Sequence, residues 1–232
     1  MNLNNFLGSF APQPARATFA EKLRSGLAGG VAILVLSWAL RDSPLNGFTL
    51  LVLASMAASA VLLFAVPHSP LAQPWTLIGG HIVSGIAGWF SCQFIPEPVL
   101  AAGLAVGSAI FLMYILSCLH PPGAATALTL VLGAANFQNM GWQNVALLVI
   151  ANAGIMLLLA LIINNLLPGR HYPALGAPPQ PLAPTKIEPE QADFEAALAE
   201  MDSTIDISLD DLMRINNLAK ERAQSRFDAK TK

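Results

Sequence analysis

One stretch of the chain, residues 120–127, combines residue types that could bind a small anion. It begins with a histidine, which can exchange a proton near neutral pH, and two prolines, whose preset φ angles suit the first turn of a helix. The small residues that follow would leave the helix backbone uncovered. Because a helix N-terminus points N–H groups and a partial positive charge outward, it favours anions. We therefore expect substrate contacts from His120, Pro121, Pro122, Gly123, Ala124, Ala125 and Thr126.

The sequence also contains two pairs of similar segments that suggest an internal repeat. Residues 26–33 match residues 103–110, and the Ala-Ala-Ser-Ala run at 57–60 matches the Ala-Ala-Thr-Ala run at 124–127. Three spans in each half would give two inverted halves, which is typical of transporters whose substrate sites lie where the halves meet. Alternatively, small residues recur because they let membrane helices pack closely. If the repeat is genuine, Ala57, Ala58 and Ser59 join the candidate substrate contacts.

Two histidines lie where a proton relay could use them. His120 could bind or relay a proton, or it could simply hydrogen-bond a carbonyl where the helix is interrupted. His81, within an apolar segment, could share the relay, or it could be a packing histidine between small residues. The hydroxyls of Ser59 and Thr126 could donate to a substrate oxygen, or each could bond the carbonyl four residues back in its own helix.

Other polar residues have simpler interpretations. Gln73 and Asn152 could line a path for substrate or join helices by hydrogen bonds. His68 is expected to be a turn residue and Glu97 a solvated loop charge, because prolines surround both.

The elements that position these residues must lie in a membrane. Of the 232 residues, 12 are Lys or Arg and 14 are Asp or Glu, but only Arg41, Asp42 and Glu97 fall between Ser25 and Leu167. Three charges could not cover the surface of a water-soluble domain of that length. A bilayer core needs roughly 20 apolar residues in a helix. Five stretches meet or approach this length, at about 25–40, 48–66, 75–95, 98–119 and 145–167. A sixth apolar stretch, 122–135, is shorter. The predicted fold is an all-α, polytopic membrane bundle of about six segments in two inverted three-helix repeats.

Several function classes are excluded by the sequence. The net charge of −2 argues against nucleic-acid binding, since such proteins are strongly basic. Cys92 and Cys118 lie in apolar stretches and indicate neither a disulfide framework nor a zinc site. No metal-ligand spacing, nucleotide-binding loop or nucleophile beside a base is present, so we expect no metal, no cofactor and no enzymatic activity.

Composition divides the chain into four parts. These are an N-terminal cytoplasmic segment (1–24), a transmembrane domain (25–167), a proline-rich linker (168–189) and a cytoplasmic helical tail (190–232). No secretory signal pattern precedes the first apolar segment. Lys and Arg flanking the spans predict that both termini lie in the cytoplasm. We expect the protein in the cell inner (plasma) membrane. The amphipathic tail either packs on neighbouring parts of the protein or binds a partner.

Two sequence runs carry a resemblance to a known family. The Ser-Pro-Leu-Ala-Gln-Pro run at 69–74 and the His-Pro-Pro tripeptide at 120–122 are similar to the HPP family of integral membrane proteins. The resemblance covers most of residues 20–167. It implies a small multi-helix membrane protein, and a transporter, since plant and cyanobacterial relatives are associated with nitrite transport. Many bacterial members continue into nucleotide-binding modules that this sequence lacks, so nucleotide regulation is not expected.

The predicted function is a transporter or channel for a small inorganic anion, with nitrite favoured and proton coupling through His81 and His120. The alternative is a membrane-embedded scaffold or sensor whose cytoplasmic tail binds a partner. The GxxxG pairs Gly26/Gly30 and Gly103/Gly107 could pack helices within one chain or form a homo-oligomer.

Overall fold

The computed structural model describes residues 17–42, 46–137 and 141–174, together with residues 212 and 216. These ranges are helical and contain no strand, which confirms the predicted all-α class. Six helices make up the bundle: α2 (Phe19–Leu40), α3 (Asn46–Ala65), α4 (Pro74–Phe94), α5 (Pro98–Ile115), α6 (Pro121–Leu132) and α8 (Trp142–Leu166). Two short elements, the 3-10 turn η1 (Pro70–Ala72) and α7 (Ala134–Phe137), connect them. The tail helix expected within 190–232 and the linker beyond residue 174 lie outside the described residues, apart from two isolated positions.

Prolines set three of the helix starts. Pro74, Pro98 and Pro121 are the first residues of α4, α5 and α6, where a missing N–H costs nothing because the first turn has no intrahelical acceptor. Glu97 is exposed and caps α5 by accepting hydrogen bonds from the N–H groups of Val99 and Leu100. His68 is exposed in a turn, as predicted.

The helix bounds differ from the expected spans at one instructive place. α5 ends at Ile115, although the apolar stretch continues to Leu119. Ser117 adopts a positive φ of 51°, and the Cys118 N–H bonds back to the Met113 carbonyl. This reversal returns the chain toward α4, so that α6 begins beside it.

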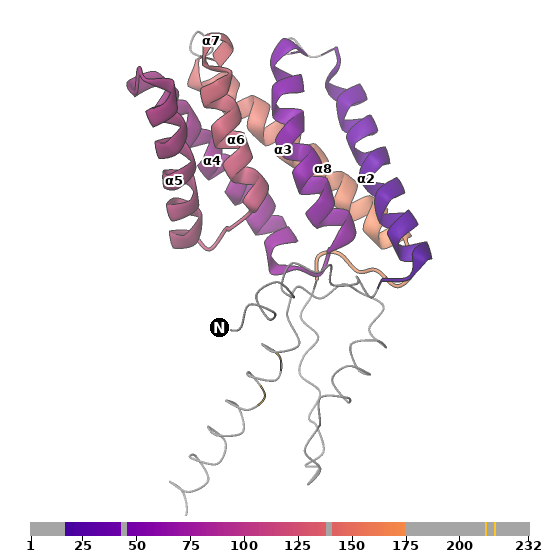
Figure 1. Ribbon diagram of the computed structural model, residues 1–232. Helices are drawn as coiled ribbons and strands as arrows, with labels where there is room; N and C mark the ends of the chain where they lie inside the picture. The colour runs from indigo at the N-terminus through magenta and orange to yellow at the C-terminus, as the bar shows by residue number, and fades with distance from the viewer. Residues whose placement is uncertain (1–16, 43–45, 138–140, 175–211, 213–215, 217–232) are drawn as a thin grey trace, which may run out of the picture. The chain divides into compact units, whose positions relative to one another are not determined.

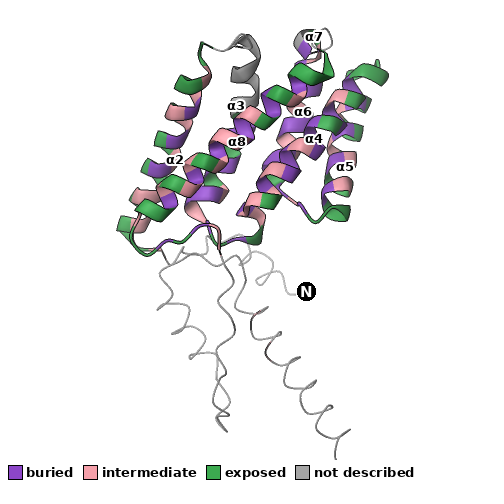
Figure 2. Cartoon of the chain, turned by 180° about the vertical axis from the view of Figure 1, so that it is seen from behind, coloured by how far each residue is buried: buried purple, intermediate pink, exposed green. Residues whose placement is uncertain are grey.

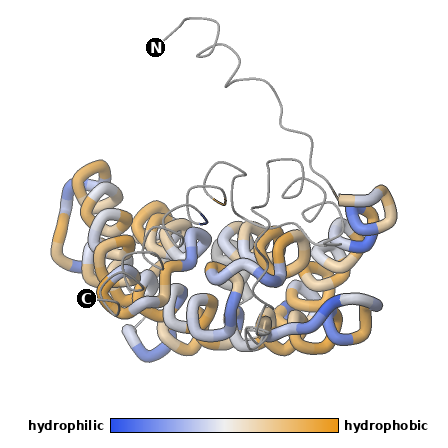
Figure 3. Tube along the Cα trace, turned by 90° about the horizontal axis from the view of Figure 1, so that it is seen from below, coloured by the Kyte–Doolittle hydropathy of each residue, from blue (hydrophilic) through white to orange (hydrophobic). Residues whose placement is uncertain are grey.

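Helices α2, α5 and α8 are long and apolar enough to cross a membrane. Helix α6 and the described apolar part of α3 (Ala54–Ala65) are shorter. Hydrophobic residues predominate along the described helices, as Figure 3 shows. The number of complete crossings and the inverted repeat therefore stay predictions.

Helix α4 lies at the centre of the packing, because it contacts α5, α6 and α8 (Figure 1). Helix α3 packs on α6 and α8, while α2 and α5 lie at opposite edges of the bundle. Small residues allow the closest approach: a Cβ built on Gly88 of α4 would lie 2.6 Å from the carbonyl oxygen of Ala127 in α6. Buried residues concentrate on the surfaces where these helices meet (Figure 2).

The two GxxxG pairs do not join helices within the described part of the chain. A Cβ built on Gly26, Gly30, Gly103 or Gly107 would meet no atom within 4 Å. All four glycines are exposed, on α2 and on α5. Packing between chains, the other role predicted for these pairs, stays a prediction.

A buried ion pair holds the start of α2 to the segment that follows α8. The Arg170 guanidinium donates to Glu21 and Ser25 of α2 and to the Asn164 side chain of α8. Arg170 is 5% exposed, so its charge depends on these partners. The same segment extends to Tyr172, whose hydroxyl donates to the Ala72 carbonyl at 2.8 Å. Burial raises the pKa of Tyr172, so this hydroxyl remains a donor.

We expect Arg170→Ala to lower the free energy of unfolding by about 2 kcal/mol. Breaking a fully buried ion pair costs more, but water reaches part of the Glu21 side chain. The loss arises because the Glu21 carboxylate, only 14% exposed, would remain largely desolvated without the Arg170 cation. Thermal unfolding in detergent, followed by circular dichroism, measures the change. Arg41→Ala is the matched control, since Arg41 pairs with Asp42 at an exposed site. Equal effects of the two substitutions would contradict the structural role of Arg170.

Candidate functional site

Five polar side chains meet where α3, α4 and α6 come together, and each has no exposed surface. We call this set, consisting of Ser55, Ser59, His81, His120 and Thr126, the histidine–hydroxyl network. Four of its members lie inside helices made mostly of apolar residues, and the fifth, His120, is the N-cap of α6. Buried polar groups are costly unless they are hydrogen-bonded, so each needs a partner.

The two histidines are brought together by a close approach of α4 and α6. A Cβ on Gly80 would lie 2.6 Å from the His120 Cβ, and a Cβ on Gly123 would lie 2.8 Å from the Gly80 carbonyl oxygen. Only glycine leaves room for backbones this close. The imidazole rings of His81 and His120 consequently lie edge to face, with centroids 5.1 Å apart.

Ser59 of α3 bridges the two rings. Its Oγ lies 2.9 Å from His81 Nε2 and 3.0 Å from His120 Nε2, and also 3.2 Å from the Ser55 carbonyl in its own helix. On the other side of His81, Nδ1 lies 2.8 Å from Thr126 Oγ1, and the Thr126 hydroxyl donates to Ser55 Oγ at 2.9 Å. The chain of contacts ends at His120 Nδ1, which lies 2.7 Å from the Leu71 carbonyl oxygen.

The hydrogen atoms in this network can be counted. A carbonyl oxygen only accepts, so His120 Nδ1 carries a hydrogen, and in the neutral ring Nε2 is an acceptor. Because the Thr126 hydroxyl donates to Ser55, it accepts from His81 Nδ1, and the neutral His81 also has an acceptor Nε2. The single Ser59 hydrogen then faces three acceptors, the two ring nitrogens and the Ser55 carbonyl oxygen. One added proton on either ring would turn that ring into a donor to Ser59 Oγ and leave the Ser59 hydrogen for one of the two remaining acceptors.

The prediction of an anion-binding site at the start of α6 is wrong in one respect. The sequence predicts an uncovered backbone with free N–H groups, but Pro121 and Pro122 have no N–H and the Gly123 N–H donates to the His120 carbonyl at 2.8 Å. Gly123 is also buried against Gly80 and Ser84 of α4. The glycine serves helix packing, and the first turn of α6 offers few donors to a ligand.

The structure brings together some of the predicted site residues and separates others. Ser59, His81, His120 and Thr126 lie in one network, and the Thr126 hydroxyl bonds neighbouring helices rather than its own. Ala57 and Ala58 are exposed on α3, whereas Ser59 is buried, so the alanines do not face the network. Pro121 is exposed, Pro122 is buried, and Ala124 and Ala125 are partly buried.

Two members of the site were missed by sequence reasoning. Ser55 lies four residues before Ser59, a spacing that places both hydroxyls on one face of α3, and this signal was available. The Leu71 carbonyl was not predictable, because a backbone acceptor has no residue-type signature. Gln73 holds the loop that presents Leu71, since its side chain donates to the carbonyls of Pro67 and Ser69. The Asn152 amide donates to Leu148 in its own helix and does not reach the network.

A known protein family matches most of the described region. The HPP transmembrane-region family matches residues 14–173, which include every member of the network. The chain belongs to the HPP family. This HPP protein is 39% identical over 164 residues to a transmembrane protein of Dictyostelium discoideum, covering 69% of this chain and 52% of the relative. A second Dictyostelium discoideum transmembrane protein is 39% identical over 155 residues, covering 63% and 53%. The chain thus spans about half the length of these relatives, and no solved structure matches.

Proposed function

We propose that this HPP protein is a transporter that carries a small inorganic anion, nitrite being the first candidate, together with a proton. The observation that carries the proposal is the Ser59 hydroxyl held between His81 and His120 in an apolar interior. Ionisable groups at membrane depth are costly and typically serve transport. An imidazole can take up and release a proton, and this is the chemistry that the proposal assigns to the two rings.

The charge balance of the site favours joint binding of anion and proton. The contacts of the network come from hydroxyls, imidazoles and backbone carbonyls, and none carries a fixed charge. An anion entering this interior would need a compensating charge, because an isolated buried charge is strongly disfavoured. A proton shared by His81 and His120 would supply it. The proposed inverted repeat adds support, since Ser59 and Thr126 come from its matched segments.

Uptake into proteoliposomes tests this proposal. Purified protein is reconstituted, and nitrite entry is measured with the outside solution at lower pH than the inside and again without a pH difference. We expect a rate above that of empty vesicles, and a further increase of up to about tenfold with an inward gradient of one pH unit, which represents 1.36 kcal/mol of driving force per proton. Protonated nitrite crosses lipid unaided, so the rate of empty vesicles under the same gradient is subtracted.

No uptake above empty vesicles would contradict nitrite as substrate, and uptake unaffected by the gradient would contradict proton coupling. Deleting residues 185–232 separates this function from the scaffold alternative. A transporter should keep its flux without the tail, whereas a scaffold would lose its function.

A further inference from the structure

The histidine–hydroxyl network lies close to one end of the bundle, the end where α2 begins and α8 ends (Figure 1). On α4, His81 is about 10 Å from the first residue, Pro74, and about 20 Å from the last, given a rise of 1.5 Å per residue. On α3, Ser59 is about 9 Å from the last residue, Ala65. The shorter path between the network and water therefore passes through the loop that joins α3 to α4.

A thin layer of chain covers the network at this end, and we call it the Leu71 loop (residues 66–73). Leu71 presents its carbonyl oxygen to His120 Nδ1 at 2.7 Å, while the adjacent residue Pro70 is exposed. The network and the exposed surface are thus separated by little more than the three-residue turn η1. An outward movement of this loop would bring His120 into contact with water.

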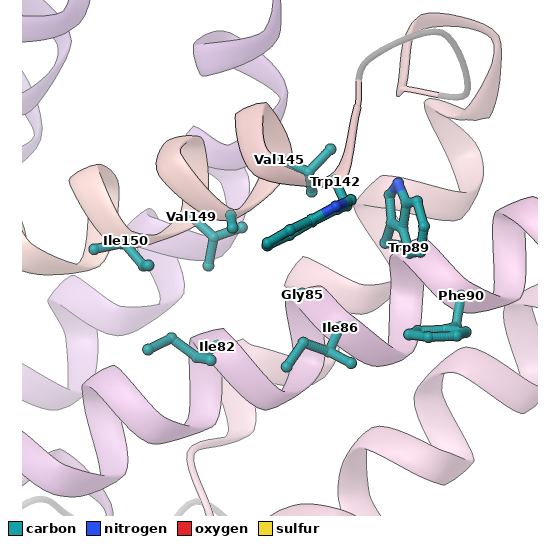
Figure 4. A pocket seen from close by; sticks show the side chains of 10 residues that line it. Ile82, Gly85, Ile86, Trp89, Phe90, Trp142, Val145, Val149 and Ile150 are labelled. Carbon is teal, nitrogen blue, oxygen red and sulfur yellow. The ribbon is translucent and has the colours of Figure 1, made fainter.

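Another opening at the surface of the bundle, an apolar groove between α4 and α8, does not lead to the network (Figure 4). Its walls include Ile82, Val145 and Val149, and no member of the network lines it. A proton or an anion needs polar partners along its path, and these side chains offer none. The Leu71 loop touches the network directly and is the better candidate for access.

The segment that follows α8, which we call the strap (residues 169–174), fastens the Leu71 loop. The Tyr172 hydroxyl donates to the Ala72 carbonyl at 2.8 Å. The Ala174 N–H donates to the Gln73 Oε1 at 2.9 Å. The amide nitrogen of Gln73 donates in turn to two carbonyls within the loop, so this one side chain joins the loop to the strap.

The strap is itself held by the helices beside it. Asn165 of α8 pairs with the Tyr172 backbone, because its amide nitrogen donates to the Tyr172 carbonyl at 2.6 Å and its oxygen accepts from the Tyr172 N–H at 3.2 Å. Arg170 binds Glu21 and Ser25 of α2. The loop over the network is therefore connected through the strap to both α2 and α8.

We propose that the Leu71 loop is a gate to the network and that the strap is the latch that holds this gate closed. The gate opens when the bonds from Tyr172 to Ala72 and from Ala174 to Gln73 break, and His120 is then reached from the end of the bundle where α2 begins. Each such neutral hydrogen bond changes the equilibrium between closed and open states by only about 2- to 13-fold. This inference rests on the proposed function, because a gate has a role only where something passes.

Chemical modification of histidines tests the gate without measuring transport. The full chain in nanodiscs is treated with diethyl pyrocarbonate, and each modified histidine is quantified by mass spectrometry of peptides. His120 has no exposed surface, so its modification requires opening, whereas the exposed His68 reacts in either state. Tyr172→Phe, which removes the donor to Ala72, should raise the rate of His120 modification roughly fivefold and leave that of His68 unchanged.

Tyr114→Phe is the matched control, because Tyr114 is exposed on α5. Gln73→Leu is a second gate variant, which removes the amide that joins the loop to the strap, and it should increase the modification of His120 at least as much. Hydrogen–deuterium exchange separates a local opening from a general loosening. The amides of residues 66–73 should exchange faster in Tyr172→Phe, while those in the interior of α4 should exchange as in the wild type.

Equal modification of His120 in Tyr172→Phe and Tyr114→Phe would overturn the proposal. So would exchange that increases throughout α4, or a wild-type His120 that reacts as fast as His68. Neither readout depends on nitrite. A gate that behaves as expected in a protein without nitrite uptake would refute the proposed substrate alone, and uptake by a protein whose His120 ignores Tyr172→Phe would refute the gate alone.

Discussion

Replacing His120 by alanine is expected to lower proton-driven nitrite uptake roughly 10- to 150-fold, because a buried hydrogen bond to a charged group contributes about 1.5–3 kcal/mol. The substitution removes an acceptor from the Ser59 hydroxyl and the donor that bonds the Leu71 carbonyl. His81 alone would then hold any proton, without the second ring that shares it through Ser59. Initial uptake rates in proteoliposomes, with the outside acidic, measure the effect.

The control for this experiment is another histidine of the same chain. His68 is exposed in the turn before η1, so His68→Ala should leave uptake within about twofold of the wild type, as for most surface substitutions. Gel filtration of both variants establishes that they remain folded. Full activity of His120→Ala would remove His120 from the mechanism, and equal losses in both variants would indicate a general loss of protein quality.

Gly88→Ala is expected to destabilise the bundle by about 2–3 kcal/mol, the upper part of the range for overpacking a close-packed interior. The new Cβ would lie 2.6 Å from the Ala127 carbonyl oxygen and 2.8 Å from its Cα, and neither backbone atom can rotate away. Helices α4 and α6 would have to move apart. Since His81 lies on α4 and Thr126 on α6, their 2.8 Å contact should lengthen as well.

Thermal unfolding in detergent measures the loss of stability, and Gly107→Ala provides the matched control. Gly107 lies in the interior of α5, and a Cβ there would meet no atom within 4 Å. Alanine has a better helix propensity than glycine, so this variant should unfold at the same temperature or slightly higher. An unfolding temperature for Gly88→Ala as high as that of Gly107→Ala would show that α4 and α6 are not packed as described.

Sequence reasoning located the helices well where prolines and apolar runs mark them. Pro74, Pro98 and Pro121 begin helices because of their own backbone chemistry, which does not depend on the rest of the fold. The reversal at Ser117 was not predictable, because serine has no local preference for a positive φ. The reversal accompanies the packing of α6 against α4, which the local sequence does not encode.

The candidate site was predicted in residue type but not in arrangement. His120, His81, Ser59 and Thr126 stood out because polar groups are rare in an apolar segment. That they bond one another depends on how α3, α4 and α6 are rotated, and periodicity cannot fix this in helices that are apolar on every face. The same uncertainty explains why Ala57 and Ala58, adjacent in sequence to Ser59, face away from it. Gly123 was misinterpreted as an open backbone because its packing partner, Gly80, lies 43 positions away in the sequence.

The bond between His120 Nδ1 and the Leu71 carbonyl has a consequence for the direction of proton movement. While this bond holds, the ring can gain or lose a proton only at Nε2, on the face toward Ser59. A proton would then leave by the route through which it arrived, and the ring would act as a store without producing net flow. In the proposed transport cycle, vectorial passage would require the imidazole to flip or the loop carrying Leu71 to withdraw. Gln73 and Tyr172 fasten that loop by hydrogen bonds, so in such a cycle they would limit how often it can advance.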